Sequence, residues 1–284
     1  MPRLGTMDRR SLLRLTGGLS LAGALGACSS TSGGVTSTSA TSTPTTFPPE
    51  RIDGGTFRSR LRGNQDTPWL LLYPPGYGRG ARLPVLITLH GTGSGEETPW
   101  ILRWPETSEA LAKEGLPPFA CAGVAGGDTW WHRRTDGTDS GAMVIEELIP
   151  LLASRGLDTR RVSLYGYSMG GVGAIYLATQ LRQPRVASVV AASTPFIPSF
   201  EVSQGAYDSP ADFAQHDIRT LWPRLSGIPV RVDIGEEDQF LQTNRDFIPT
   251  ARPAPEFHIS PGGHNREFWG GVALDELRFV ARHL

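Results

Sequence analysis

The sequence has only two cysteines, Cys28 and Cys121, in 284 residues. Because Cys28 precedes the part of the chain with a folding pattern, no disulfide can form within the folded domain. Cys121 lies in an apolar run, residues 119 to 124, which favours a buried, unreactive thiol over a nucleophile. We therefore expect neither a disulfide framework nor cysteine-based catalysis.

Basic side chains do not outnumber acidic ones. The chain has 27 Lys and Arg against 28 Asp and Glu. Residues 1 to 27 hold four arginines and Asp8, so the rest of the chain has 23 basic and 27 acidic side chains, a net charge of −4. This balance excludes the electrostatic footprint of a nucleic-acid-binding protein. His132, His258 and His264 lack the spacing of metal ligands, so neither a metal nor a cofactor is expected.

The N-terminal region has no hydrophobic run long enough to cross a membrane. The apolar run from Leu15 to Ala27 has 13 residues, whereas a bilayer needs about 20. With the arginines before it, this run predicts a cleaved signal peptide over residues 1 to 27. The three residues before Cys28 complete a segment that resembles a lipobox, which implies lipidation of Cys28. Residues 8 to 14 resemble a twin-arginine export signal.

Residues 29 to 50 are nearly all Ser, Thr, Gly and Pro, which predicts a flexible linker. We therefore divide the chain into a signal peptide (1–27), a lipidated cysteine with its linker (28–50) and a catalytic domain (51–284). Cys28 would anchor a monomeric domain to the outer face of the cytoplasmic membrane, in the cell envelope.

Strand and helix patterns alternate through the domain, which predicts an α/β fold with a mostly parallel sheet flanked by helices. The apolar run at 84–89 is typical of a strand buried on both faces. Residues 194 to 227 lack strand signals and are expected to form a short helical lid or an insertion. We expect strands at 56–61, 69–73, 84–89, 119–124, 162–165, 186–192, 230–234 and 256–259, and helices at 107–114, 140–153, after Ser168, at 244–248 and at 268–283.

The segment around Ser168 carries the strongest functional signal. A β-branched and apolar run leads into Gly166-X-Ser168-X-Gly170, and apolar residues at helical spacing follow. This is the pattern of a nucleophile elbow, in which a sharp turn between strand and helix presents the serine hydroxyl. Glycines are needed where larger side chains would collide across the turn.

A serine nucleophile needs a base and a group that orients the base. In proteins with this elbow the acid and then the histidine follow the serine along the chain. His264 lies on a Gly-rich loop after the last predicted strand, and we assign it as the base. Three carboxylates, Glu236, Glu237 and Asp238, follow the strand at 230–234; Asp238 is preferred and Glu237 comes next.

The oxyanion of a tetrahedral intermediate needs backbone N–H donors. We expect one from Met169, which follows the nucleophile, and one from the loop after the third strand, at Thr92 in preference to Gly93. His90 is expected to hold that loop by hydrogen bonds. The glycines of this loop are not followed by Lys-Ser/Thr, which makes a nucleotide-binding loop improbable.

The chain resembles the esterase D superfamily of α/β-hydrolases, which includes feruloyl and acetyl xylan esterases, S-formylglutathione hydrolase and the antigen 85 mycolyltransferases. The resemblance rests on His90-Gly91, residues 166–171, Asp238, Gly263-His264 with Phe268-Trp269, and residues 147–150. It implies the α/β-hydrolase fold and a triad but no substrate. Antigen 85 members use a glutamate as the acid, which disfavours mycolyl transfer here. S-formylglutathione hydrolases are generally cytosolic, in conflict with the export signal.

Trp130 and Trp131 follow the fourth predicted strand, on the side of the sheet where ligands collect, and are candidates for substrate contact or for packing the loop onto the core. Three functions remain open. The first is a serine esterase acting on small-molecule or glycan esters. The second is an acyltransferase in which an envelope sugar or glycolipid replaces water. The third is a non-catalytic binding protein, which the complete set of Ser, Asp and His disfavours.

Overall fold

The computed structural model describes residues 47–284. The predicted signal peptide, Cys28 and nearly all of the linker lie outside these residues, so these assignments stay predictions. Within the described residues, no helix combines the length and the apolar character needed to cross a membrane.

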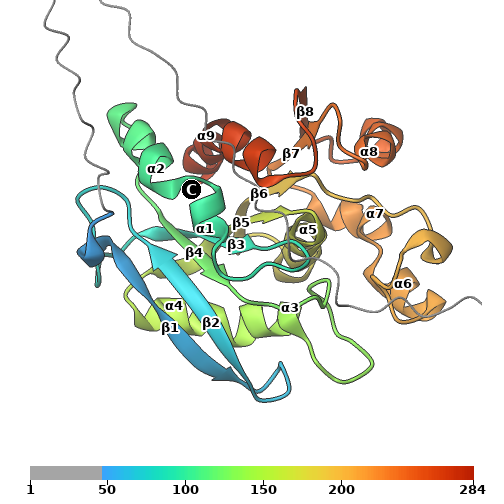
Figure 1. Cartoon of the computed structure of the whole chain (residues 1–284), viewed down its shortest axis with the longest axis horizontal. Coiled ribbons are helices and arrows are strands. Elements are labelled where there is room, and N and C mark those ends of the chain that lie inside the picture. Colours follow the sequence, from blue (N-terminus) through green and yellow to red (C-terminus); the bar gives the residue numbers. More distant parts are fainter. Residues whose placement is uncertain (1–46) are drawn as a thin grey trace, which may run out of the picture. The chain divides into compact units, whose positions relative to one another are not determined.

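In this part of the chain eight strands form one sheet, in the order β1-β2-β4-β3-β5-β6-β7-β8 (Figure 1). β2 is antiparallel to both of its neighbours, and all other neighbouring strands are parallel. The mostly parallel sheet expected from the sequence is therefore confirmed. The strands are β1 (Ile52–Ser59), β2 (Gln65–Leu72), β3 (Pro84–Leu89), β4 (Ala120–Val124), β5 (Asp158–Tyr167), β6 (Val186–Ala192), β7 (Val230–Gly235) and β8 (Glu256–Ser260).

Helices cover both faces of the sheet (Figure 1). α5 packs on β5 and β6 from one face, and α9 packs on β6 and β7 from the other. The α-helices are α1 (Thr98–Ile101), α2 (Trp104–Lys113), α3 (Ser140–Met143), α4 (Ile149–Ser154), α5 (Met169–Leu181), α6 (Pro210–His216), α7 (Ile218–Leu221), α8 (Leu241–Phe247) and α9 (Arg266–His283). A π-helical turn, η2 (Val144–Leu148), joins α3 to α4.

The side chains of the central strands alternate between two hydrophobic cores. On β3, Val85 and Ile87 point into the core beneath α5, whereas Leu86 points into the core beneath α9. All three side chains are completely buried. A strand covered on both faces needs apolar residues at every position, which is why the run at 84–89 shows no alternation.

The remaining differences from the sequence-based expectation are local. α1 was not predicted, because a four-residue helix is too short to show a period. The helix expected at 140–153 is interrupted by the π-helical turn. Residues 194 to 227 form no strand, as expected; they hold α6, α7 and the 3-10 turns η3 (Phe200–Val202) and η4 (Trp222–Leu225).

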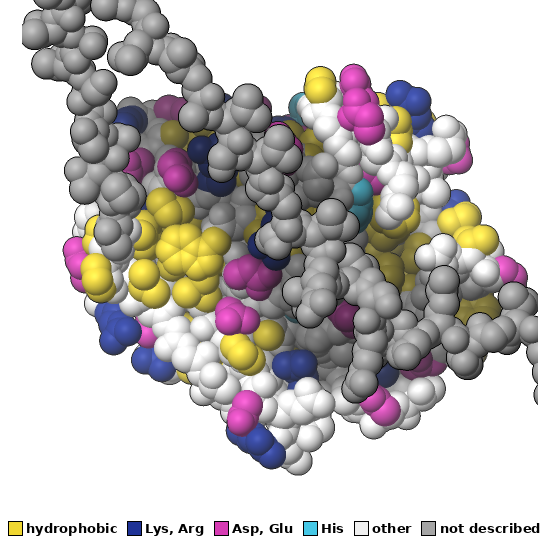
Figure 2. All heavy atoms as spheres, in the orientation of Figure 1, with side chains coloured by type: hydrophobic (Ala, Val, Ile, Leu, Met, Phe, Trp, Pro, Cys, Tyr) yellow, Lys and Arg dark blue, Asp and Glu magenta, His cyan; other side chains and the backbone are white. Residues whose placement is uncertain are grey.

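Charged side chains of both signs are spread over the face in Figure 2, and hydrophobic side chains gather between α2 and β2. Neither sign forms a continuous patch on the visible part of this face. This distribution agrees with the balanced charge of the sequence.

Candidate active site

Ser168 stands at the junction of β5 and α5 with φ 55° and ψ −125°, a conformation that L-residues rarely adopt. The turn is so tight that a Cβ atom on Gly166 would collide with the carbonyl of Gly170, and one on Gly170 would collide with the carbonyl of Leu89. The two glycines therefore make the elbow sterically possible. The Ser168 N–H donates to the Ala192 carbonyl at 2.9 Å, which ties the turn to β6.

The three residues predicted to act together lie in one hydrogen-bonded line. His264 Nε2 is 2.9 Å from Ser168 Oγ, and His264 Nδ1 is 3.0 Å from Asp238 Oδ2. Because an ionised carboxylate only accepts hydrogen bonds, the proton of a neutral His264 lies on Nδ1 and is donated to Asp238. The Nε2 lone pair is then free to accept the Ser168 proton.

Asp238 is the deepest member of this line, with a side chain 0% exposed, against 22% for His264. Burial alone would raise the pKa of Asp238. Hydrogen bonds from His264 and from the Phe240 N–H, together with the polar Ser193 hydroxyl, outweigh burial and hold its pKa below the ordinary value. Asp238 is thus ionised at neutral pH and able to orient His264.

Ser193 and Trp269 support the triad from beside Asp238 and His264. The sequence did not reveal this supporting role. Ser193 follows β6 and is fully buried. Its hydroxyl accepts a hydrogen bond of 2.9 Å from Trp269 Nε1 and contributes to the lowered pKa of Asp238. The rings of Trp269 and Phe240 also lie nearly perpendicular to that of His264, at centroid distances of 5.3 and 5.1 Å. Trp269, five residues after His264, was noted only as part of a family motif.

The two neighbouring carboxylates do not reach His264. Glu236 and Glu237 are both exposed. Glu237 Oε2 instead accepts a hydrogen bond of 2.7 Å from the Gly262 N–H, which fixes the loop that carries the histidine. Among the three acids that follow β7, only Asp238 turns into the site.

The two N–H groups expected to form the oxyanion hole are free to donate hydrogen bonds. Within the described residues, neither the Met169 N–H nor the Thr92 N–H has a hydrogen-bond acceptor. The two residues touch, since Thr92 Oγ1 lies 3.8 Å from Met169 Sδ. The Gly93 N–H, the weaker alternative, is already donated to Asp128 Oδ1 at 2.8 Å. Thr92 is therefore the better partner for Met169.

His90 holds the loop that carries Thr92 through hydrogen bonds of its buried ring. Its Nδ1 donates to the Gly91 carbonyl at 2.7 Å, and its Nε2 accepts from the Gly126 N–H at 2.8 Å. Because Nε2 accepts, the ring must be neutral, and burial lowers the pKa of His90 accordingly. The side chain is fully buried and does not line the cleft at Ser168.

The two tryptophans expected near substrate have different positions. Trp130 lines the cleft. Trp131 is 0% exposed, and its Nε1 donates to the His90 carbonyl at 3.2 Å. A Cβ atom on Gly126 or Gly173 would collide with its indole ring, so these glycines make room for it. The expectation of substrate contact is therefore wrong for Trp131, which packs the loop onto the core.

Ser168 and His264 face a cleft of about 490 Å³ beyond the carboxyl ends of the parallel strands. Segment 194–227 contributes part of its wall. No aspartate, glutamate, lysine or arginine of the described residues lines the cleft. The lining residues are Gly91, Thr92, Ser94, Trp130, Tyr167, Ser168, Pro195, Ile197, Val202, Ser203, Gln204, Gln239, Phe240, His264 and Trp269.

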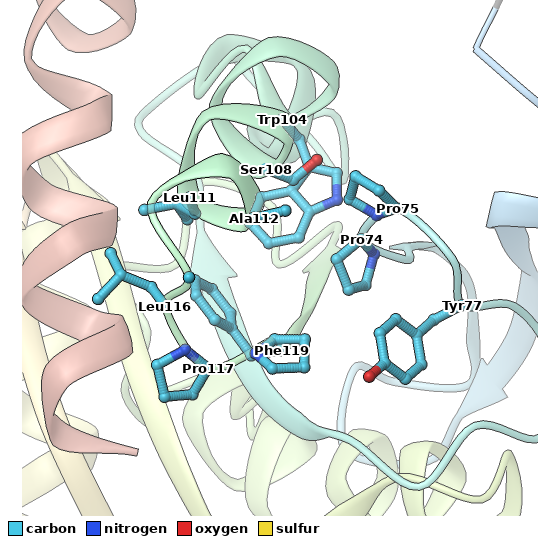
Figure 3. Close-up of a pocket in the computed structure, with 12 residues that line it drawn as sticks. Pro74, Pro75, Tyr77, Trp104, Ser108, Leu111, Ala112, Leu116, Pro117 and Phe119 are labelled. Carbon is cyan, nitrogen blue, oxygen red and sulfur yellow. The ribbon is translucent and has the colours of Figure 1, made fainter.

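A second cavity, of about 200 Å³, lies at the amino ends of the parallel strands (Figure 3). Prolines, Trp104, Leu111 and Phe119 face it, and among the described residues that line it only Tyr77 has an ionisable side chain. It offers no nucleophile.

Cys121 is completely buried and free, and burial raises the pKa of its thiol well above the ordinary value, as expected for an unreactive cysteine.

Comparison with known proteins identifies the family. Residues 62–272 match the model of a family described as "Putative esterase". The chain belongs to this esterase family. The resemblance to esterase D-type α/β-hydrolases is therefore confirmed for family and fold, and the chain is a serine ester hydrolase.

Individual relatives are more distant. The chain is 26% identical to an S-formylglutathione hydrolase of Rattus norvegicus over 256 residues, covering 75% of this chain and 88% of that protein. Its fold is similar to that of a ferulic acid esterase, with a TM-score of 0.69, 20% identity and coverage of 82% and 98% of the two chains. An S-formylglutathione hydrolase from Agrobacterium tumefaciens has a TM-score of 0.67 and 18% identity, with coverage of 82% and 95%.

Proposed function

We propose that this protein hydrolyses carboxylic esters through an acyl-enzyme on Ser168, with His264 as general base and acid and Asp238 as the orienting carboxylate. The observation that carries the proposal is the unbroken line of hydrogen bonds from Ser168 Oγ through His264 to Asp238, with its open end in the cleft. Serine needs such a line because its hydroxyl is a weak nucleophile until a base removes its proton.

Acylation begins when Ser168 Oγ attacks the ester carbonyl carbon and its proton passes to His264 Nε2. The carbonyl oxygen becomes an oxyanion and accepts hydrogen bonds from the Met169 and Thr92 N–H groups. The ionised Asp238 stabilises the imidazolium. When the tetrahedral intermediate collapses, the bond to the alcohol oxygen breaks, that oxygen takes the proton from His264, and the acyl group stays on Ser168.

Deacylation repeats these steps with water. His264 Nε2 takes a proton from the water, whose oxygen attacks the acyl carbon, and the same N–H groups hold the new oxyanion. The bond to Ser168 Oγ then breaks and Oγ recovers the proton from His264. The products are a carboxylic acid and a regenerated enzyme.

The cleft favours uncharged substrates. Its walls combine aromatic and aliphatic side chains, among them Trp130, Ile197 and Phe240, with the amides of Gln204 and Gln239. A charged group would lose its water without gaining a counterion here, since no aspartate, glutamate, lysine or arginine of the described residues lines the cleft. We propose esters with a neutral acyl group and a neutral alcohol as substrates.

We further propose that the enzyme works in the cell envelope, tethered through lipidated Cys28. The support is the signal-like N-terminus and the resemblance of the residues before Cys28 to a lipobox. Detergent partitioning and mass spectrometry of the full chain test this, because Cys28→Ala should remove both the acyl mass and the membrane association. A membrane-bound Cys28→Ala protein would contradict the lipid anchor.

The catalytic proposal is tested with p-nitrophenyl esters from acetate to decanoate, for wild type and Ser168→Ala, with and without a sugar acceptor. Loss of the nucleophile should lower kcat by several orders of magnitude, on the order of 10⁶ in another serine hydrolase. Equal rates for both proteins would refute the assignment of Ser168. Accumulation of acylated sugar would indicate a transferase. A wild type that neither turns over esters nor gains mass from a fluorophosphonate would indicate a binding protein.

A further inference from the structure

Away from Ser168, the fold brings His132, Asp212 and His216 into one buried cluster. Asp212 and His216 lie one helical turn apart on α6 and so share a face. His132 reaches them from the loop after β4. The side chains of His132, Asp212 and His216 are only 2%, 13% and 6% exposed. The histidine spacing alone did not predict this cluster, because its members come from two separate segments.

The cluster has the dimensions of a metal site. The three residues each offer a potential ligand atom within 4.8 Å of the others. Asp212 Oδ1 is 2.8 Å from His216 Nδ1 and 3.7 Å from His132 Nδ1. Tetrahedral Zn²⁺ with ligand bonds of about 2.0–2.2 Å places its ligand atoms roughly 3.4 Å apart, between these two distances.

The hydrogen bonds of His132 leave a place for a cation. Its Nε2 is 3.0 Å from the Ala206 carbonyl, and its Nδ1 is 3.0 Å from the Arg133 carbonyl. A neutral imidazole has one N–H, so whichever nitrogen lacks the proton directs its lone pair at a carbonyl oxygen. A positive charge on that nitrogen, such as a bound cation, would remove this repulsion.

A metal on Nδ1 removes the same repulsion. The Nε2–H of His132 then donates to Ala206, which is the arrangement usual for histidine ligands: one nitrogen on the metal, the other donating to a backbone carbonyl.

We propose that His132 Nδ1, Asp212 Oδ1 and His216 Nδ1 bind one divalent transition-metal ion, with two imidazoles and a carboxylate as a ligand set suited to Zn²⁺. In the metal-free protein His216 Nδ1 lies 3.0 Å from the main-chain carbonyl of Asp212, to which its N–H donates, and 2.8 Å from Asp212 Oδ1; this proton leaves when the metal binds. The two rings are stacked at 4.4 Å, so binding turns at least one ring to bring its lone pair onto the ion.

The site would be structural, since it fastens α6 and the segment before it to the loop that carries Trp130. That contact already includes hydrogen bonds from Arg134 to Asp208 and to the carbonyls of Gly205 and Ala206. Ser203 and Gln204, just before it, line the cleft beside Trp130. A metal here would therefore stiffen one wall of the cleft without touching the reacting atoms.

The test uses the full chain, purified without a histidine tag and freed of metal with a chelator. Native mass spectrometry should show one Zn²⁺ per chain. At 100-fold excess over Kd, Zn²⁺ should raise Tm by about 5–10 °C. Co²⁺ should give the intense visible bands of a tetrahedral site. Asp212→Asn and His216→Gln should abolish the stoichiometric ion and the rise in Tm.

Two controls locate the ion. His258→Gln replaces an exposed histidine beside Glu256 and should bind Zn²⁺ like wild type. His264→Ala should do so too, since it removes the only histidine at Ser168. Should His216→Gln fail to fold, Asp212→Asn decides, because its amide oxygen keeps the role of acceptor. No Zn²⁺ on wild type, full binding by Asp212→Asn, or loss of binding in His264→Ala would each overturn the proposal.

Discussion

Replacing Asp238 with asparagine should disable the enzyme through one misplaced proton. The carboxylate accepts from the Phe240 N–H on Oδ1, at 2.9 Å, and from His264 Nδ1–H on Oδ2, at 3.0 Å. An asparagine that keeps the first contact presents its NH2 to His264 Nδ1. That nitrogen must then accept, the ring proton moves to Nε2, and Nε2 donates to Ser168 Oγ instead of accepting its proton. Flipping the amide would instead place its NH2 against the Phe240 N–H, again one donor facing another.

The loss can be sized from these contacts. Restoring the productive tautomer places two donors face to face and leaves two buried polar groups unpaired, at about 1–3 kcal/mol each. A total of about 2–6 kcal/mol corresponds to a factor of roughly 30 to 3 × 10⁴ in kcat. Loss of the charge that stabilises the imidazolium favours the upper end, and the corresponding change in a serine protease costs about 10⁴.

The assay is the kcat for p-nitrophenyl acetate in wild type, Asp238→Asn and Glu237→Gln. Glu237 is the matched control, since it is the adjacent carboxylate and contacts only the loop at Gly262. We expect it to stay within about threefold of wild type, and KM to change little in either variant. Asp238→Asn activity within tenfold of wild type, or an equal loss in Glu237→Gln, would refute the reasoning.

Three further predictions follow from buried groups around the site. Ser193→Ala removes the buried hydroxyl that accepts from Trp269 Nε1 and favours the ionised form of Asp238. A loss of about 0.5–1.5 kcal/mol should lower kcat roughly 2- to 10-fold at nearly constant KM, and an unchanged kcat would exclude this positioning role. Burial raises the pKa of Glu276, so the folded state retains a proton that the unfolded state releases. The stability of the fold should therefore fall as pH rises above the ordinary pKa of 4.5. The Tm of Glu276→Gln should vary less between pH 5 and 9 than that of wild type. Gly173→Ala places a methyl group against the Trp131 indole and should lower the free energy of unfolding by about 1–3 kcal/mol, whereas Gly271→Ala, with open space around it, should not; equal urea midpoints would contradict this.

Most of these predictions concern side chains that are buried or that face the cleft, and few depend on the exposed surface. Glu276 is an example: it is completely buried on α9, and within the described residues neither of its carboxylate oxygens has a hydrogen-bond partner. Its position on the helix could be read from the sequence. Its lack of a partner depends on the strands that α9 packs against.

The sequence by itself determined the parts of this protein that depend on near neighbours in the chain. The elbow is one such part, because a Cβ atom on Gly166 would collide with the carbonyl of Gly170, only four residues further along the chain. The alternation of strands and helices is another, since a strand covered on both faces needs an uninterrupted apolar run, as in β3. The chain order of nucleophile, acid and base followed from the resemblance to a family.

Only the tertiary structure decided what depends on contacts between distant segments. Ser168 and His264 are 96 residues apart, yet their side chains share a hydrogen bond. Adjacent residues took opposite roles: Asp238 turned inward and Glu237 outward, and Trp130 reached the cleft while Trp131 filled the core. The sequence favoured Asp238 over Glu237 but did not distinguish Trp130 from Trp131. The orientation of each side chain is set by the space that other strands and helices leave around it.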